Sequence, residues 1–149
     1  MKEYVIALAT RIPSHDTQYV LLVERVKQDW QFGRLNLPGG GIEGDEPPEV
    51  AGCRELEEET GYKAWELREL TSGPPSAGMS SEVVTFLLAT KLERKSAGGG
   101  DHSETIEVHK VPLADVPRWL EKRREHGTLV DPKVYAGLYF AERAVRAIR

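Results

Sequence analysis

The stretch that decides the fold runs from Gly40 to Tyr62 and reads GGIEGDEPPEVAGCRELEEETGY. Residues 48–60 of this stretch predict a helix, because they are rich in Glu, Leu, Ala and Arg and contain no proline after Pro48. Gly61 follows the last helical residue, as is common where a helix ends. The residues expected to start the helix are Asp45 or Glu46 as the cap and Pro47 or Pro48 at the first position.

Carboxylates crowd the last turn of this predicted helix. At about 100° per residue, Glu55, Glu58 and Glu59 fall within one arc of the helix surface, whereas Glu57 lies on the opposite side. Like charges three and four residues apart repel each other, and the helix dipole also disfavours anions in a last turn. The pattern therefore predicts that a cation binds to this arc.

The other side of the helix carries an apolar stripe. Cys53, Leu56 and Thr60 form this stripe and are expected to pack on a sheet. Gly52 flanks the carboxylate arc, and a glycine inside a helix costs about 1 kcal/mol relative to alanine. Its position, like that of the glycines at 39–41, suggests that a ligand approaches the backbone closely.

The length and charge of the chain narrow the class of protein. With 149 residues, 40% of them hydrophobic, the chain is expected to form a single domain over residues 1–149. The net charge is −4, but residues 43–59 alone carry −7, which leaves +3 for the remainder. This distribution suits a metal held by carboxylates beside a small anionic ligand, and it argues against a nucleic-acid-binding surface.

The cysteine content and the hydropathy of the sequence indicate the cellular compartment. The chain has one cysteine, Cys53, which cannot form a disulfide within the chain. No apolar run approaches the length of a membrane span, and the N-terminal MKEYVIALAT is too short for a secretory signal. We therefore expect a cytoplasmic protein with no membrane partner.

Apolar periodicity predicts an α/β fold around the helix. Tyr4–Thr10 and Tyr19–Glu24 read as two strands with a hairpin-like connection, and residues 96–100 read as a flexible loop. Further strands are predicted at Ala64–Leu70, Val83–Ala89 and Thr105–Val111, and helices at Leu113–Arg124 and from Pro132 onward. This order predicts a mixed β-sheet flanked by helices on both faces.

The spacing of the fixed residues resembles the signature of the Nudix hydrolases. These residues are Gly40, Glu46, Arg54-Glu55-Leu56, Glu58-Glu59 and Gly61. The resemblance covers 23 residues and departs from the family only at Tyr62, where an aliphatic residue is usual. It implies an α/β/α sandwich and a hydrolase of nucleoside diphosphates linked to another group, dependent on Mg²⁺ or alternatively Mn²⁺. Carboxylates on a rigid helix suit that chemistry, because they can hold Mg²⁺ against phosphate oxygens.

The resemblance also assigns roles by position in the motif. It implies that Glu55, Glu58 and Glu59 are catalytic metal ligands, joined by the carbonyl of Gly39. Arg54 would orient a catalytic carboxylate. Glu46 and Gly61 would serve the structure of the motif, and Gly40 would lie against the substrate.

The general base and the substrate contacts have to be argued outside the motif. Glu104 is the preferred base, because it ends a flexible loop just before a strand and a carboxylate there can swing toward a metal. Glu107 and Glu82 are the alternatives, and His102 is a candidate phosphate contact. Trp30 and Phe32 are candidates for stacking on a base, and Arg11 and Arg34 for pairing with phosphate.

The segments 75–82 and 104–113 resemble the ADP-ribose pyrophosphatase branch of the family, although Ala77 stands where that branch commonly has proline. The expected reaction is hydrolysis of ADP-ribose or a nucleotide sugar to a nucleoside monophosphate and a sugar phosphate. The alternatives are a pyrophosphatase for modified nucleoside triphosphates and a regulatory module that binds nucleotide without hydrolysis. A homodimer would need an interface other than a long N-terminal sheet, because only three residues precede the first predicted strand.

Overall fold

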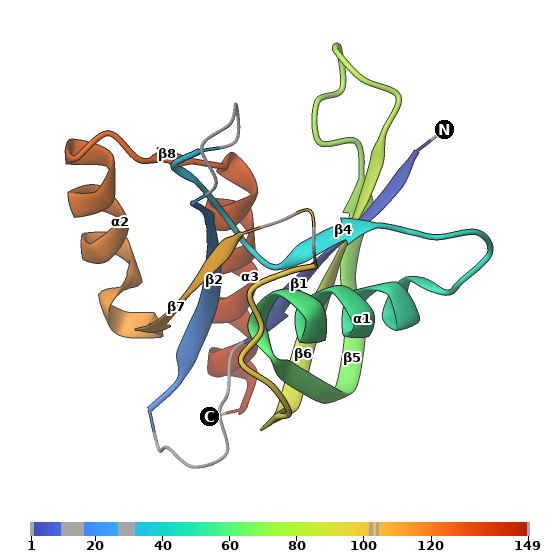
Figure 1. The fold of residues 1–149 in the computed structure, drawn as a ribbon, viewed down its shortest axis with the longest axis horizontal. Coiled ribbons are helices and arrows are strands. Elements are labelled where there is room, and N and C mark those ends of the chain that lie inside the picture. The colour runs from blue at the N-terminus through green and yellow to red at the C-terminus, as the bar shows by residue number, and fades with distance from the viewer. Residues whose placement is uncertain (1, 10–16, 27–31, 102, 104, 149) are drawn as a thin grey trace.

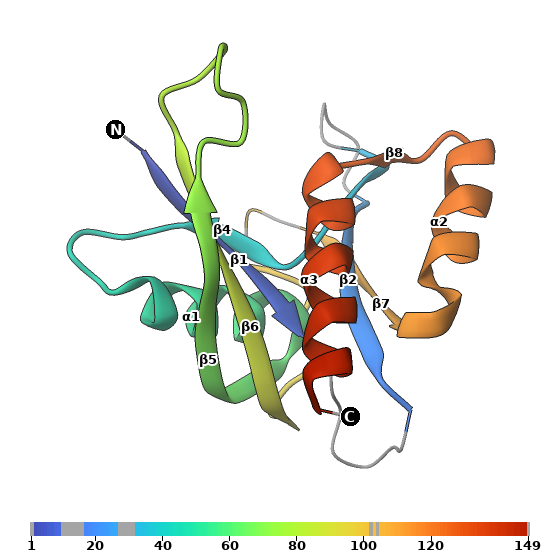
Figure 2. The same ribbon diagram turned by 180° about the vertical axis from the view of Figure 1, so that it is seen from behind.

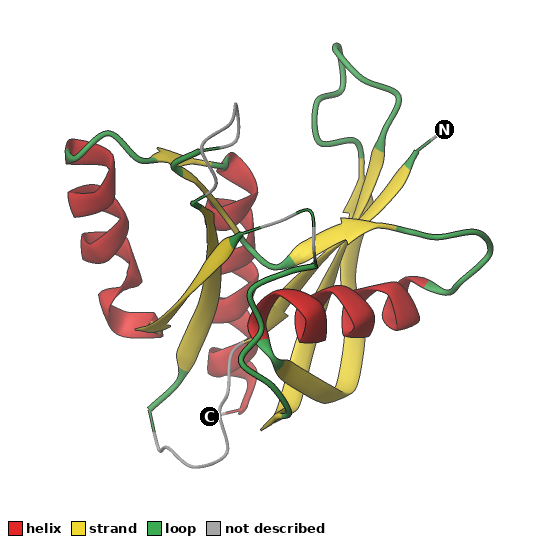
Figure 3. Ribbon diagram, in the orientation of Figure 1, coloured by secondary structure: helices red, strands yellow, loops and turns green. Residues whose placement is uncertain are grey.

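A computed structural model describes residues 2–9, 17–26, 32–101, 103 and 105–148 of the chain. Figure 3 shows helices and strands mixed along the chain, as an α/β fold requires. In chain order the elements are β1 (Glu3–Ala9), β2 (Tyr19–Arg25), β3 (Arg34–Asn36), β4 (Gly39–Gly41), α1 (Pro48–Thr60), β5 (Tyr62–Gly73), β6 (Val83–Arg94), β7 (Ile106–Pro112), the 3-10 helix η1 (Leu113–Asp115), α2 (Val116–Glu125), β8 (Leu129–Val130) and α3 (Pro132–Ile148).

The strands form two four-stranded sheets, ordered β4-β1-β6-β5 and β7-β2-β3-β8. Both sheets are mixed: β1 runs parallel to β6 and antiparallel to β4, and β3 runs parallel to β8 and antiparallel to β2. The predicted hairpin between the first two strands is therefore wrong, because β1 and β2 belong to different sheets. The reason is burial: β1 is apolar on both faces and lies inside its sheet, between β4 and β6.

In the described part of the chain, the α-helices α1, α2 and α3 cover and separate the sheets, as Figures 1 and 2 show from opposite sides. α1 packs on the first sheet, where Ala51 contacts Val5 and Leu87. α3 lies between the two sheets, because its buried residues share one apolar cluster with β1 and β6 on one side and β2 and β3 on the other. α2 packs on the second sheet through Val116 and Leu120. The fold class expected from the sequence is confirmed, with the strands divided between two sheets.

Most predicted elements have the bounds expected. The helix predicted at 48–60 is α1, and the helix predicted at 113–124 begins as η1 and continues as α2. β5 and β6 are each 12 residues long and extend beyond the predicted strands, because they pair with each other along almost their full length. The short strands β3, β4 and β8 were not predicted, since three or fewer residues show no periodicity.

Two expectations about α1 are wrong in detail. Pro47 is the N-cap and no side chain caps the helix, because Glu46 bonds elsewhere. A side chain on Gly52 would meet Leu87 and Leu67, so Gly52 allows close packing on β5 and β6 instead of the approach of a ligand. No helix in the described part of the chain is long and apolar enough to cross a membrane.

Candidate functional site

The glycines before α1 form β4 and bring the backbone against the carboxylates of the helix. β4 pairs with β1, with Gly39 opposite Ile6 and Gly40 opposite Val5. A Cβ atom on Gly39 would overlap the carbonyl oxygen of Val5, and one on Gly40 would overlap the carboxylate of Glu55. The position of Gly40 therefore tolerates no side chain, because Glu55 lies directly against β4.

Glu59 is buried between α1, β4 and β2. Its side chain is 2% exposed, and its Oε2 accepts a hydrogen bond of 2.9 Å from the backbone N–H of Gly39. Its Oε1 lies 3.8 Å from Nη2 of Arg25, at the end of β2. A carboxylate that is buried needs such partners, because its desolvation is otherwise costly. The amide and the guanidinium therefore hold this side chain in place.

Arg54 connects the carboxylate of Glu55 to the turn before the helix. Its Nη1 donates to Glu55 Oε1 at 2.9 Å, and its Nη2 donates to Glu46 Oε1 at 2.6 Å and to the carbonyl of Gly41 at 3.1 Å. Glu46 Oε1 also accepts a hydrogen bond of 2.9 Å from the backbone N–H of Glu43. One guanidinium thus fixes both the loop 41–46 and the orientation of Glu55.

The opposite charges of Arg54 and Glu46 stabilise each other. The hydrogen bond from Arg54, followed by that from the N–H of Glu43, lowers the pKa of Glu46 below its usual value. The hydrogen bond to Glu46, ahead of that to Glu55, raises the pKa of Arg54 above its usual value. Glu46 and Arg54 are therefore both charged at neutral pH.

Glu58 is exposed beside the end of α1, where a glycine-rich segment caps the helix. The N–H groups of Gly99 and Gly100 donate to the carbonyls of Glu59 and Glu58 at 2.8 and 3.0 Å, and the N–H of Gly61 donates to Glu57 at 2.8 Å. Residues 96–100 form a loop, as predicted, and they cap the helix because Gly98, Gly99 and Gly100 adopt positive φ. A hollow of about 550 Å³ lies beside it, lined by Arg54, Glu57, Glu58, Ser96, Gly98 and Gly100.

A second cavity, of about 460 Å³, opens on the other side of Glu59. Gly39 and Glu59 line one part of it, and Arg25 and Arg34 bring two guanidinium groups to the same space. The remaining lining residues are Val23, Leu35, Asn36, Leu37, Leu129, Val130, Asp131 and Pro132. Apolar walls with a few charged groups are typical of a pocket for a small molecule.

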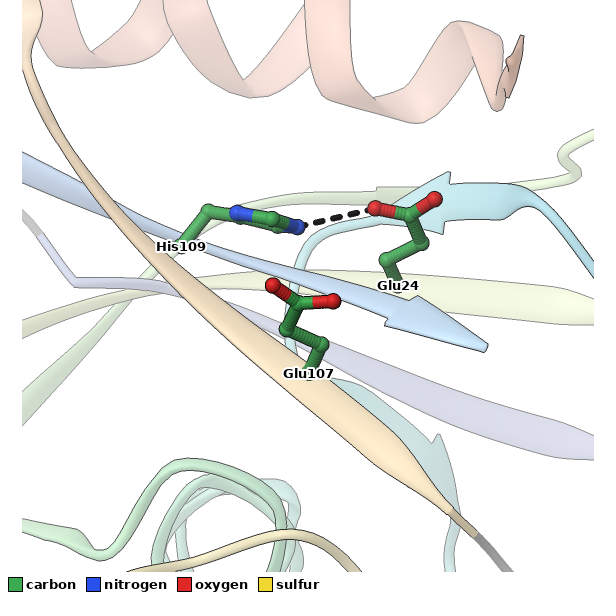
Figure 4. A group of neighbouring side chains, drawn as sticks. All are labelled: Glu24, Glu107 and His109. Carbon is green, nitrogen blue, oxygen red and sulfur yellow. Dashed lines mark hydrogen bonds and ion pairs between the residues drawn. The ribbon is translucent and has the colours of Figure 1, made fainter. Parts of the chain in front are cut away.

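Glu107, an alternative general base, lies in a different group of side chains. Figure 4 shows it beside Glu24 and His109, with a hydrogen bond of 2.8 Å between His109 Nε2 and Glu24 Oε2. Glu107 pairs with Glu24 across the strands, and the next residue, Arg25, turns to the opposite face of β2. Glu107 thus belongs to the face of this sheet that points away from Glu59.

Two sets of side chains bear on the binding of a metal ion. The predicted ligands Glu55, Glu58 and Glu59 provide only oxygen atoms, which suit Mg²⁺ or Mn²⁺, but in the described chain their ligand atoms do not all lie within 4.8 Å of one another. One ligand atom each of Glu24, Glu107 and His109 lie within 4.8 Å of one another. In this second group Arg123 already pairs with Glu24, so a guanidinium provides the positive charge that a metal would bring.

The remaining predicted residues lie in several places. Arg34 lines the cavity beside Glu59, whereas Phe32 is 53% exposed and does not line it. Glu82 precedes β6 and lines neither the cavity nor the hollow beside Glu58. Arg11, Trp30, His102 and Glu104 lie outside the described residues.

Sequence reasoning missed two charged residues of the cavity, Arg25 and Asp131. Arg25 is the last residue of β2. The sequence feature that could have indicated it is its position as the first cationic residue after the apolar run of that strand. Asp131 is held near the site by its backbone N–H, which donates to the carbonyl of Leu35 at 2.9 Å. Its position depends on the pairing of β3 with β8, which no local pattern indicates.

The sequence of the chain matches the model of a known protein family. The family model of the NUDIX domain matches residues 5–130 of the chain. The match includes β4, α1 and the strands that line the cavity beside Glu59, and it therefore extends well beyond the motif.

Two curated relatives are similar along much of the chain. The ADP-ribose pyrophosphatase of Bacillus subtilis (strain 168) is 33% identical over 112 residues, which cover 72% of this chain and 59% of that protein. The ADP-sugar pyrophosphatase of Mus musculus is 34% identical over 143 residues, which cover 89% of this chain and 62% of that protein. The chain spans about three fifths of the length of these relatives.

A solved structure supports the same fold. The structure described as "Crystal structure of ADP compounds hydrolase" superposes with a TM-score of 0.78, over 98% of this chain and 74% of that one. The sequences are 20% identical, so this similarity concerns the fold.

Proposed function

The chain belongs to the NUDIX domain family, and on this premise we propose that it hydrolyses the pyrophosphate bond of a nucleoside diphosphate linked to a second group. The proposed substrate class is ADP-ribose or a nucleotide sugar. The products would be a nucleoside monophosphate and a sugar phosphate.

The observation that carries this proposal is the composition of the cavity beside Glu59. Arg25 and Arg34 bring two guanidinium groups to the same space as Glu59 and Gly39. Guanidinium groups bind phosphate oxygens through paired hydrogen bonds, so this arrangement supports a diphosphate as the ligand. The apolar wall formed by Leu35, Leu37 and other residues supports a ligand that also has a less polar part.

The residues proposed to hold a divalent cation are Glu55, Glu58 and Glu59, with the carbonyl of Gly39. Such a cation, when bound, neutralises charge on the phosphate oxygens and activates water. The members of this set differ in their exposure to solvent. Glu58 is accessible from solvent, whereas Glu59 is fixed by the N–H of Gly39.

The protein's own groups would position the substrate. Arg25 and Arg34 would bind the diphosphate, and Arg54 would keep Glu55 oriented through the hydrogen bond of 2.9 Å that joins them. Glu104 remains the proposed general base. Glu107 is less suited to that role, because it lies with Glu24 and His109 on the face of its sheet that points away from Glu59.

The proposal is tested by identifying products from a panel of substrates. The purified chain is incubated with Mg²⁺ and ADP-ribose, an ADP-sugar, ATP or an oxidised deoxynucleoside triphosphate, and the products are separated by anion-exchange chromatography. We expect AMP and a sugar phosphate from the first two substrates. A chelator in excess over Mg²⁺ should stop turnover, and added Mg²⁺ should restore it.

Two results would contradict the proposal in different ways. Release of inorganic pyrophosphate from the triphosphates, without turnover of ADP-ribose, would identify a triphosphate pyrophosphatase. Tight binding of nucleotides without hydrolysis of any substrate in the panel would identify a regulatory binding module.

A further inference from the structure

A third cleft lies between β5 and the C-terminal half of α3, away from the cavity beside Glu59. It has a volume of about 410 Å³ and is lined by Arg68, Leu70, Phe140, Arg143, Ala144 and Arg146. α3 connects the two places: Pro132 at its start lines the cavity beside Glu59, and Arg143 lies about 16 Å further along the helix axis. Figure 2 shows β5 and α3 on the side of the molecule that faces away from α1.

Three arginines converge on this cleft. Arg68, Arg143 and Arg146 are exposed, and within the described chain none of them forms an ion pair with a carboxylate. Arg54 and Arg123 pair with Glu46 and Glu24, whereas Arg118 and Arg124 on α2 also form no ion pair with a carboxylate in the described chain, so it is the convergence of three arginines on one hollow that distinguishes this cleft. Three like charges around one hollow repel each other in the free protein, and a bound anion would relieve that repulsion.

A helix dipole explains only part of this arrangement. Cationic side chains in the last turn of a helix are favourable, and Arg146 lies in the last turn of α3, with Arg143 one turn earlier. Arg68 comes from β5 and is not part of that helix. The meeting of a strand residue with two helix residues therefore needs a further reason, and an anionic ligand provides one.

The floor of the cleft is apolar and includes an aromatic ring. Leu70, Phe140 and Ala144 are half-buried there. The ring of Phe140 packs 6.0 Å from Phe86 and 5.3 Å from Tyr139, measured between centroids, so its orientation is held by the core. The guanidinium of Arg143 lies over the ring of Tyr139 at 5.4 Å, which fixes one cation at the rim.

We propose that this cleft binds an organic phosphate that carries a flat ring, of the class of nucleoside monophosphates. The arginines would bind the phosphate through the paired donors of their guanidinium groups, and the ring would pack on Phe140. The volume is that of a small-molecule site. This binding does not depend on the proposed hydrolysis, because no residue of the cleft belongs to the cavity beside Glu59.

The test uses AMP as the probe, with a chelator present so that no turnover occurs. Backbone amide signals of the ¹⁵N-labelled chain are followed by NMR during the titration. We expect the signals of residues 68–70 and 140–146 to shift with AMP. In the double variant Arg68→Ala, Arg146→Ala, the Kd reported by these signals should rise at least about tenfold, because two charge-assisted contacts are lost.

Two further measurements make the outcome decisive. Arg118→Ala removes an exposed arginine from α2, outside the cleft, and should leave the Kd unchanged. If the amide spectrum shows that the double variant does not fold, Arg68→Gln replaces it, and the Kd for AMP should again rise. Inorganic phosphate as a second probe should bind more weakly than AMP, because it has no ring.

The proposal is overturned if AMP shifts only the signals around Gly39 and Glu59, or if the double variant binds AMP like the unmodified chain. Equal affinity for AMP and inorganic phosphate would also overturn it, because Phe140 would then make no contribution.

Discussion

At the scale of single residues, Glu58 and Glu59 show how neighbours in sequence acquire different environments. Glu59 is 2% exposed and accepts a hydrogen bond from Gly39, whereas Glu58 is exposed beside the glycine cap. Removal of charge at Glu59 therefore alters both a buried contact and the proposed metal site. Removal of charge at Glu58 breaks no buried contact, so Glu58 is the cleaner probe of the proposed metal site.

Glu58→Gln should lower turnover at least about a hundredfold, because it removes a charge proposed to hold the metal. The same change should raise the free energy of unfolding by about 0.2–0.5 kcal/mol, because it relieves repulsion in the last turn of α1. Steady-state kinetics and urea unfolding measure the two effects. Glu125→Gln is the matched control, since it removes an exposed carboxylate from the last turn of α2 and should leave turnover unchanged. Near-normal turnover of Glu58→Gln would refute its role as a metal ligand.

At the scale of elements, the end of α1 depends on residues that lie about forty positions further along the chain. The N–H groups of Gly99 and Gly100 satisfy the last carbonyls of the helix, which would otherwise need water. Gly98 packs so closely on the helix end that a Cβ there would lie 2.7 Å from the carbonyl oxygen of Glu59. The carboxylates of the last turn are thus held by a connection between β6 and β7.

Gly98→Ala should lower the free energy of unfolding by about 1–3 kcal/mol, because alanine disfavours the φ of +69° and its methyl group meets backbone atoms. Urea unfolding measures this loss. Gly73→Ala is the control: a Cβ there meets nothing within 4 Å and the residue does not have positive φ. Equal stability of the two variants would show that the glycine cap does not support α1.

At the scale of the whole molecule, α2 is joined to the second sheet through a buried charge. Arg123 on α2 pairs with Glu24 on β2, and Glu24 also bonds to His109 on β7. The next residue, Arg25, reaches Glu59 from the opposite face of β2. The packing of α2 therefore supports the strand that brings Arg25 to the candidate site.

Arg123→Met should lower the free energy of unfolding by about 1–3 kcal/mol, because Glu24 stays buried without its guanidinium partner. Thermal and urea unfolding measure the change. Arg118→Met, at an exposed position of the same helix, should stay within about 0.5 kcal/mol of the unmodified chain. A double variant that adds Glu24→Gln should lose less than the sum of the single changes, and strict additivity would contradict the coupling.

The sequence alone determined the helix 48–60, the arc of Glu55, Glu58 and Glu59 on it, and the α/β class. These features depend on local periodicity, on proline and glycine at helix ends, and on fixed spacing within 23 residues, all of which act between near neighbours.

Only the tertiary structure decided which distant segments meet. It placed β1 and β2 in separate sheets and packed Leu87 against Gly52, where a side chain would not fit. It also brought Arg25 and Asp131 to the cavity beside Glu59. It also formed the helix cap from residues 98–100 and the arginine cleft from β5 and α3. The physical reason is that pairing between strands and burial of apolar faces are settled by competition across the whole chain, and no local pattern encodes their outcome.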